Sequence, residues 1–115
     1  MPWFKVDDGL AFHPKVIAAG NAGMGLWLRA GAWSAQQLTD GEIPTEIAGL
    51  LGTSAEAKRL VKAGLWTPKD EGFAFHEWEL YQPSRIQVMA EREAAQQRMR
   101  EHRKRRRELR TKAEG

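Results

Sequence analysis

Residues 44–64 read PTEIAGLLGTSAEAKRLVKAG and predict two short helices joined by a tight turn. Pro44 suits the first turn of a helix and Gly52 suits its end, because proline has a fixed φ and glycine tolerates a positive one. Thr53 is then an N-cap, and Glu56 three residues later completes a capping box. Apolar residues follow at the spacing of one buried helix face. The segment therefore predicts a helix-turn-helix.

A β-hairpin is predicted directly after these two helices. Residues 65–67 and 73–76 are β-prone, and the charged segment PKDEG at residues 68–72 forms the turn between them. The β-prone run WFKV at residues 3–6 offers a third strand for the same sheet. A helix-turn-helix followed at once by a hairpin is the winged-helix arrangement.

Two further helices are predicted upstream of residue 44. Pro14 opens a short helix that stops at Gly20. Residues 22–38 form a longer helix that is apolar nearly all round, which indicates burial. The fold class is therefore α+β, mainly α with a small β-hairpin, and we expect a winged-helix head spanning residues 1–82.

Charge divides the chain into two unlike parts. Residues 1–80 carry 7 Lys/Arg against 10 Asp/Glu, a net of −3, whereas residues 81–115 carry 11 against 5, a net of +6. Residues 84–112 contain no proline or glycine and are rich in good helix formers. We expect residues 83–115 to form a basic helical tail that frays past about residue 100. A polyanion is the natural partner of such a dense cationic run.

Two sets of cations are the candidate DNA-binding residues. Lys58, Arg59 and Lys62 lie opposite the apolar face of the second helix, the helix that enters the major groove in a helix-turn-helix protein. Arg59 has the fork geometry that reads guanine, and the two lysines suit phosphate. The hairpin tip is too acidic for strong contact with phosphates. The tail supplies the second set, which we expect to clamp phosphates of DNA or RNA: Arg98, Arg100, Arg103, Lys104, Arg105, Arg106, Arg107 and Arg110. The alternatives for the tail are binding to an acidic protein and, third, a passive solubilising role.

The sequence contains no arrangement of residues typical of a catalytic site. The chain has no cysteine, and its three histidines have neither metal-ligand spacing nor acidic partners. We therefore expect no catalytic residues, no metal and no cofactor. The first residues do not resemble a secretory signal, and no run approaches the ~18 apolar residues of a membrane helix. We expect no membrane association and a place in the bacterial host cytoplasm, bound to DNA.

The order of short motifs along residues 3–85 carries a family resemblance. The motifs are WFKVD at 3–7, HPK at 13–15, GLWLR at 25–29, TDGEIP at 39–44, AGLW at 63–66, FHEW at 75–78 and YQPS at 81–84. With them the chain resembles small actinobacteriophage proteins similar to the amino-terminal winged-helix domain of phage replisome organisers and DnaD-type replication initiation proteins. The resemblance implies DNA binding in phage replication initiation or in transcription control. Larger organisers carry a second domain where this chain has a basic helix, so the resemblance does not extend to recruiting a helicase loader.

These observations predict a non-catalytic protein that binds DNA, with double-stranded DNA as the first partner. The alternative is a protein-interaction module that binds host or phage replication or transcription machinery, because winged helices also mediate protein contacts. A short apolar seam in the early tail, at Ile86, Met89, Ala90 and Ala94, allows packing against the head or a weak homodimer.

Overall fold

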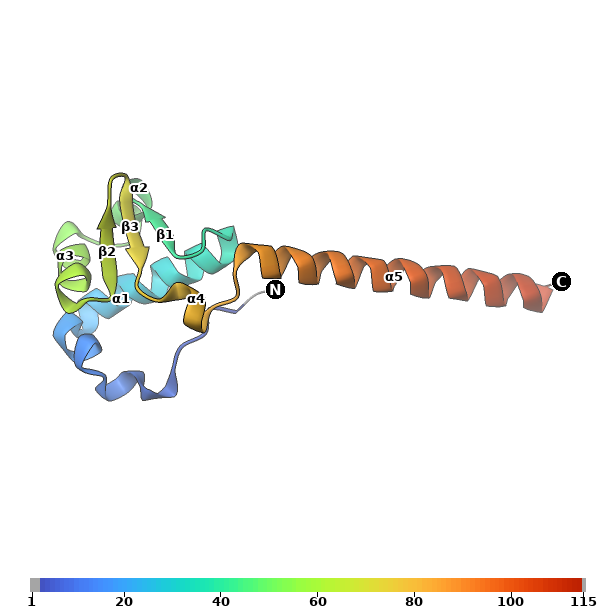
Figure 1. Ribbon diagram of the computed structural model, residues 1–115, viewed down its shortest axis with the longest axis horizontal. Coiled ribbons are helices and arrows are strands. Elements are labelled where there is room, and N and C mark those ends of the chain that lie inside the picture. The colour runs from blue at the N-terminus through green and yellow to red at the C-terminus, as the bar shows by residue number, and fades with distance from the viewer. Residues whose placement is uncertain (1–2, 115) are drawn as a thin grey trace. The chain divides into compact units, whose positions relative to one another are not determined.

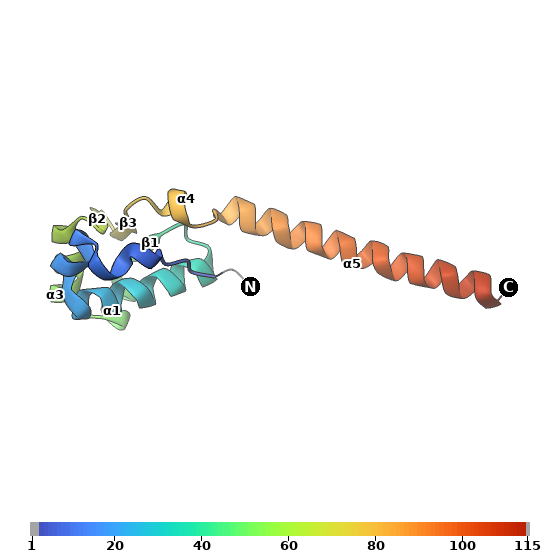
Figure 2. The ribbon, with the colours of Figure 1, turned by 90° about the horizontal axis from the view of Figure 1, so that it is seen from below.

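The computed structural model describes residues 3–114, and the chain divides into two compact units after Ser84. The first unit is α+β, with a small three-stranded antiparallel sheet among its helices (Figures 1 and 2). The second unit is a single helix. Mainly helical structure with a small sheet is therefore confirmed. The elements in order are η1 (Asp8–Phe12), α1 (Pro14–Gln37), β1 (Glu42–Pro44), α2 (Thr45–Leu51), α3 (Ser54–Ala63), β2 (Trp66–Lys69), β3 (Gly72–Phe75), α4 (Trp78–Tyr81) and α5 (Arg85–Glu114).

The sheet is built around the predicted hairpin. Strands β2 and β3 pair antiparallel across the turn, with Trp66 opposite Phe75 and Lys69 opposite Gly72. Strand β1 adds to the other edge of β3, with Ile43 opposite Phe73, so the strand order is β1-β3-β2. The third strand is thus supplied by residues 42–44, between α1 and α2.

The expectation that residues 3–6 supply a strand is wrong. The Phe4 ring inserts between helix and sheet, at centroid distances of 5.1 Å from Trp27, 6.0 Å from Phe75 and 5.8 Å from Trp78. The side-chain amide of Gln82 accepts a hydrogen bond from the Lys5 N–H (2.9 Å) and donates one to the Lys5 carbonyl (2.6 Å). A side chain therefore pairs with the backbone here, where a strand would need a neighbouring strand.

Helix α1 joins the two upstream helices predicted from the sequence. Its backbone leaves helical geometry at Gly20, where φ is 73° and ψ is 171°. This is the residue at which the first of these helices was expected to stop. Only glycine adopts such a conformation without strain, so the glycine at position 20 explains where the helix kinks.

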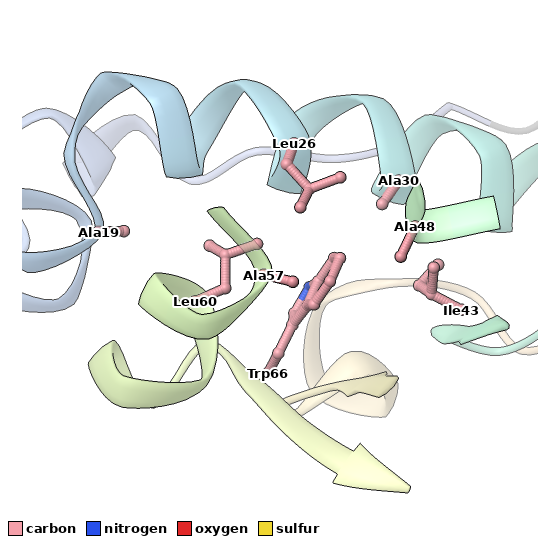
Figure 3. Packing of buried hydrophobic residues seen from close by; sticks show 8 residues of the cluster. All are labelled: Ala19, Leu26, Ala30, Ile43, Ala48, Ala57, Leu60 and Trp66. Atoms are coloured by element: carbon pink, nitrogen blue, oxygen red, sulfur yellow. The ribbon is translucent and has the colours of Figure 1, made fainter. Parts of the chain in front are cut away.

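The core lies between α1, the sheet and the pair of helices α2 and α3 (Figure 3). Leu26 and Ala30 point from α1 toward Trp66, which enters the space from β2, and Leu60 of α3 packs beside Ala57 (Figure 3). Gly23 of α1 faces α3, because a Cβ built there would lie at van der Waals distance from Arg59 (3.8 Å) and Leu60 (3.9 Å). This packing fixes α3 on the framework of α1.

The second unit consists of α5, a helix of 30 residues. At ~1.5 Å per residue it is about 45 Å long. The helix continues past residue 100, where we expect fraying, and reaches Glu114 without a break. Among the residues described, no helix combines the length and the hydropathy needed to cross a bilayer.

Candidate nucleic-acid interface

Helix α3 is held at both ends by local hydrogen bonds. The Thr53 hydroxyl accepts a bond from the Glu56 N–H (3.2 Å), and the Glu56 carboxylate accepts one from the Thr53 N–H (2.7 Å). Gly64 ends the helix in the left-handed region at φ 83°. The predicted capping box is therefore present, and it fixes where the helix begins.

Helix α1 also positions the turn between α2 and α3. The Arg29 guanidinium donates a hydrogen bond of 2.8 Å to the carbonyl of Leu51, in the last turn of α2. A helix leaves its last carbonyls without partners, so a cation at this place satisfies one of them and complements the helix dipole. The two helices are thus tied to one framework at the turn.

The outward face of α3 is cationic. Lys58, Arg59 and Lys62 are all exposed, whereas Ala57 is 4% and Leu60 0% exposed on the opposite side. Across the residues that the structure describes, none of the three cations forms an ion pair with a carboxylate. The structure therefore presents all three predicted residues of the head together, with their charges unneutralised by the chain itself.

Arg59 is directed toward the kink in α1. A Cβ on Gly20 would lie only 3.0 Å from Arg59 Nη1, so the guanidinium rests directly against this glycine. Arg59 thus lies where α3 packs against α1.

Lys15 extends the cationic surface and was not predicted. Its Cε would lie 3.6 Å from a Cβ at Gly64, which brings the first turn of α1 to the end of α3. The residue is half-buried and lies 49 positions before Gly64 in the chain. Only tertiary packing brings it there, so no spacing rule could have identified it.

The hairpin tip has the opposite charge. Glu42, Asp70 and Glu71 line one shallow groove together with Lys69. Only residues 70–71 form the tight turn between β2 and β3. The expected turn of residues 68–72 is too long, because Pro68 and Lys69 pair with Phe73 and Gly72 in the sheet. Three carboxylates around one lysine make this part of the head a poor surface for phosphates.

The eight predicted cations of the tail all lie on α5. All residues from 95 to 113 are exposed. Within the described part of the chain, no ion pair links a cation between Arg98 and Lys112 to a carboxylate. The tail therefore presents its cations in helical order rather than as a disordered run.

Two of the histidines come closer together than the sequence indicates. His13 and His76 both line a cavity of about 210 Å³ in the first unit, along with Asp7 and Glu77. His13 caps α1 by accepting a hydrogen bond from the Lys15 N–H at 3.2 Å, and His76 lies 3.2 Å from the Glu77 carboxylate. The residues described contain no group of three or more side chains able to hold a metal ion.

Comparisons with protein-family models, with curated proteins and with solved structures find no match to this chain.

Proposed function

We propose that this chain is a winged-helix protein that binds double-stranded DNA and catalyses no reaction. In this proposal α3 docks in the major groove and α5 binds phosphates. Phage replication initiation and transcription control are the two processes in which such a protein would act, as the family resemblance suggests.

The observation that carries the proposal is the unpaired cationic face of α3. Lys58, Arg59 and Lys62 stand on the second helix of a helix-turn-helix, the element that reads the major groove in proteins of this class. The order α1-β1-α2-α3-β2-β3 and the β1-β3-β2 sheet agree with a winged helix. The excess of cations on α5 adds attraction that is independent of DNA sequence.

The proposal is tested by measuring binding to a random 24-base-pair duplex across a salt series. We expect tight binding at low salt that weakens steeply as salt rises, because each neutralised phosphate contributes about 0.9 to the log–log slope. In Lys58→Ala/Lys62→Ala, the loss of two phosphate contacts lowers that slope by about 2. Arg59→Ala instead relaxes the sequence preference measured by selection from a random pool.

The matched control is Lys5→Ala/Lys69→Ala, which removes the same charge from exposed residues outside α3. Lys69 lies beside two carboxylates at the hairpin tip, so we expect its removal to leave the slope nearly unchanged. Equal losses in the two double variants would mean that only net charge matters, and would refute docking through α3. If the unmodified chain does not bind the duplex at any salt concentration, the whole proposal is refuted.

A protein-interaction module is the second candidate. Large apolar side chains are exposed on the first unit, including Phe12 at 87%, Leu50 at 77% and Leu80 at 71%. Together with the net negative charge of residues 1–80 and the acidic hairpin tip, they favour a protein partner over DNA for surfaces other than α3. This candidate would be supported if a protein of the replication or transcription machinery bound the chain at high salt and the chain itself did not bind DNA.

A further inference from the structure

The cations of α5 are arranged by side of the helix. An α-helix turns by about 100° per residue. Projected on that basis, six cations between residues 98 and 112 fall within one arc of ~160°, namely Arg100, Arg103, Lys104, Arg106, Arg107 and Arg110.

The acidic residues of this segment lie outside the arc. Glu101 and Glu108 project within ~20° of each other on the other side of the helix. The remaining cations, Arg98, Arg105 and Lys112, project on that same side. Between residues 98 and 112, one side of α5 thus carries only positive charges and the other carries mixed charge. Glu93, earlier in the helix, projects into the same arc, so we name only the six-cation arc of residues 98–112 the cationic face of α5.

We infer that α5 binds duplex DNA as a folded helix, through its cationic face alone. This inference rests on the proposed function and specifies which side of the tail carries the contact. Arg100 and Arg110 are ~15 Å apart along the axis, so the cationic face extends over about three helical turns. The B-form major groove, ~12 Å wide, admits an α-helix. A helix lying in that groove faces phosphates on both walls, and an arc of this width presents cations to both.

The mixed side has the wrong composition for the same role. Glu101 and Glu108 would face phosphates if the helix were turned over, and like charges at this distance repel. A disordered tail, by contrast, would use all its cations equally, because no side would be fixed. Because residues 85–114 form one continuous helix, six of the cations between residues 98 and 112 are held on one side of it.

Two triple variants of the full chain test this inference, each removing three positive charges. Arg103→Ala/Arg106→Ala/Arg110→Ala removes three of the six positive charges of the cationic face. Arg98→Ala/Arg105→Ala/Lys112→Ala is the matched control on the mixed side. Alanine is at least as good a helix former as arginine or lysine, so circular dichroism should show equal helicity in both.

The readout is the affinity for a random DNA duplex from 50 to 300 mM salt. We expect the cationic-face variant to lose on the order of 100-fold in affinity near 150 mM salt and about 2–3 in salt slope. The control should lose less than about one slope unit. Equal losses would overturn the one-sided contact while leaving DNA binding intact, and no loss in either variant would remove α5 from DNA binding.

A duplex RNA of the same sequence distinguishes the nucleic acid. Its major groove is too deep and narrow to admit a helix, so we expect weaker binding and no difference between the two variants. A cationic-face variant that loses RNA affinity as strongly as DNA affinity would overturn the assignment to a DNA groove.

Discussion

Substituting Gly31→Ala should destabilise the first unit, although alanine is the better helix former. Gly31 is buried in the middle of α1, and a methyl group there would overlap the ring of Phe4. The ring must leave its place for the methyl group to fit. The substitution therefore tests whether residues 3–7 pack on α1 as the structure has them.

The expected magnitude follows from two opposing effects. Losing a buried phenyl ring costs about 3–5 kcal/mol in a full core, and Phe4 is half-buried, so we expect about 2 kcal/mol from its displacement. Replacing glycine by alanine inside a helix returns about 1 kcal/mol. The net effect of Gly31→Ala is thus a loss of about 1 kcal/mol in the free energy of unfolding.

The sign should reverse when Phe4 is removed first. In Phe4→Ala, itself destabilised by about 2 kcal/mol, the space over Gly31 is open. Adding Gly31→Ala to that variant should then stabilise it by about 1 kcal/mol through helix propensity alone. The coupling between the two sites is about 2 kcal/mol, well above the usual error of a double-mutant cycle.

Urea unfolding followed by tryptophan fluorescence is the suitable assay. All five tryptophans lie within the first 78 residues, so the signal reports on the first unit and is silent about α5. In thermal melts a change of 1 kcal/mol corresponds to about 4–8 °C for a unit of this size. The same sign for Gly31→Ala in both backgrounds would refute the packing of Phe4 on α1.

Three further predictions use the same assay. Thr53→Ala removes the cap of α3 and should lower stability by about 1 kcal/mol, whereas Thr53→Ser should retain it. Gln82→Ala removes both hydrogen bonds to Lys5 and should lower stability by about 2 kcal/mol; a loss below about 0.5 kcal/mol would show that water replaces them. Gly20→Ala places a side chain at positive φ against Arg59 and should lower stability by about 1–3 kcal/mol, and an unchanged midpoint would contradict the kink.

The parts of the fold that the sequence predicts are those encoded over a few residues. Thr53 and Glu56 are three positions apart and form their reciprocal bonds without help from the rest of the chain. Gly20 and Gly64 mark a kink and a helix end because their backbone conformations exclude most other residues. The hairpin is similarly local. These signals place α2, α3 and the β2–β3 hairpin close to where the structure has them.

The parts that sequence reasoning missed depend on distant partners. Residues 42–44 form a strand of three residues that ends in proline, and only pairing with β3 makes them one. Phe4 has high β propensity but is placed by Gly31, Trp27 and Trp78. Tertiary packing overrides propensity where it buries a large aromatic ring.

The candidate site follows the same rule. The spacing of Lys58, Arg59 and Lys62 along one helix was sufficient to place them on a common exposed face. The place of Lys15 and the contact between Arg59 and Gly20 come from the packing of α1 on α3, which no pattern within either helix reveals. In the proposed function Arg59 reads base edges, and its contact with α1 is not visible in the sequence.

In the proposed function, the local charge of the head matters more than its net charge for its approach to DNA. Residues 1–80 are negative on average, yet the carboxylates of Glu42, Asp70 and Glu71 gather in one groove at the hairpin tip, and the exposed face of α3 carries cations alone. At ~0.15 M salt an interaction fades within about 8 Å, so phosphates in contact with α3 respond mainly to its own residues. The acidic tip then disfavours the turned orientation in which the hairpin leads. In the proposed function, these three of the ten carboxylates of residues 1–80 favour an orientation in which α3, and not the hairpin tip, meets the duplex.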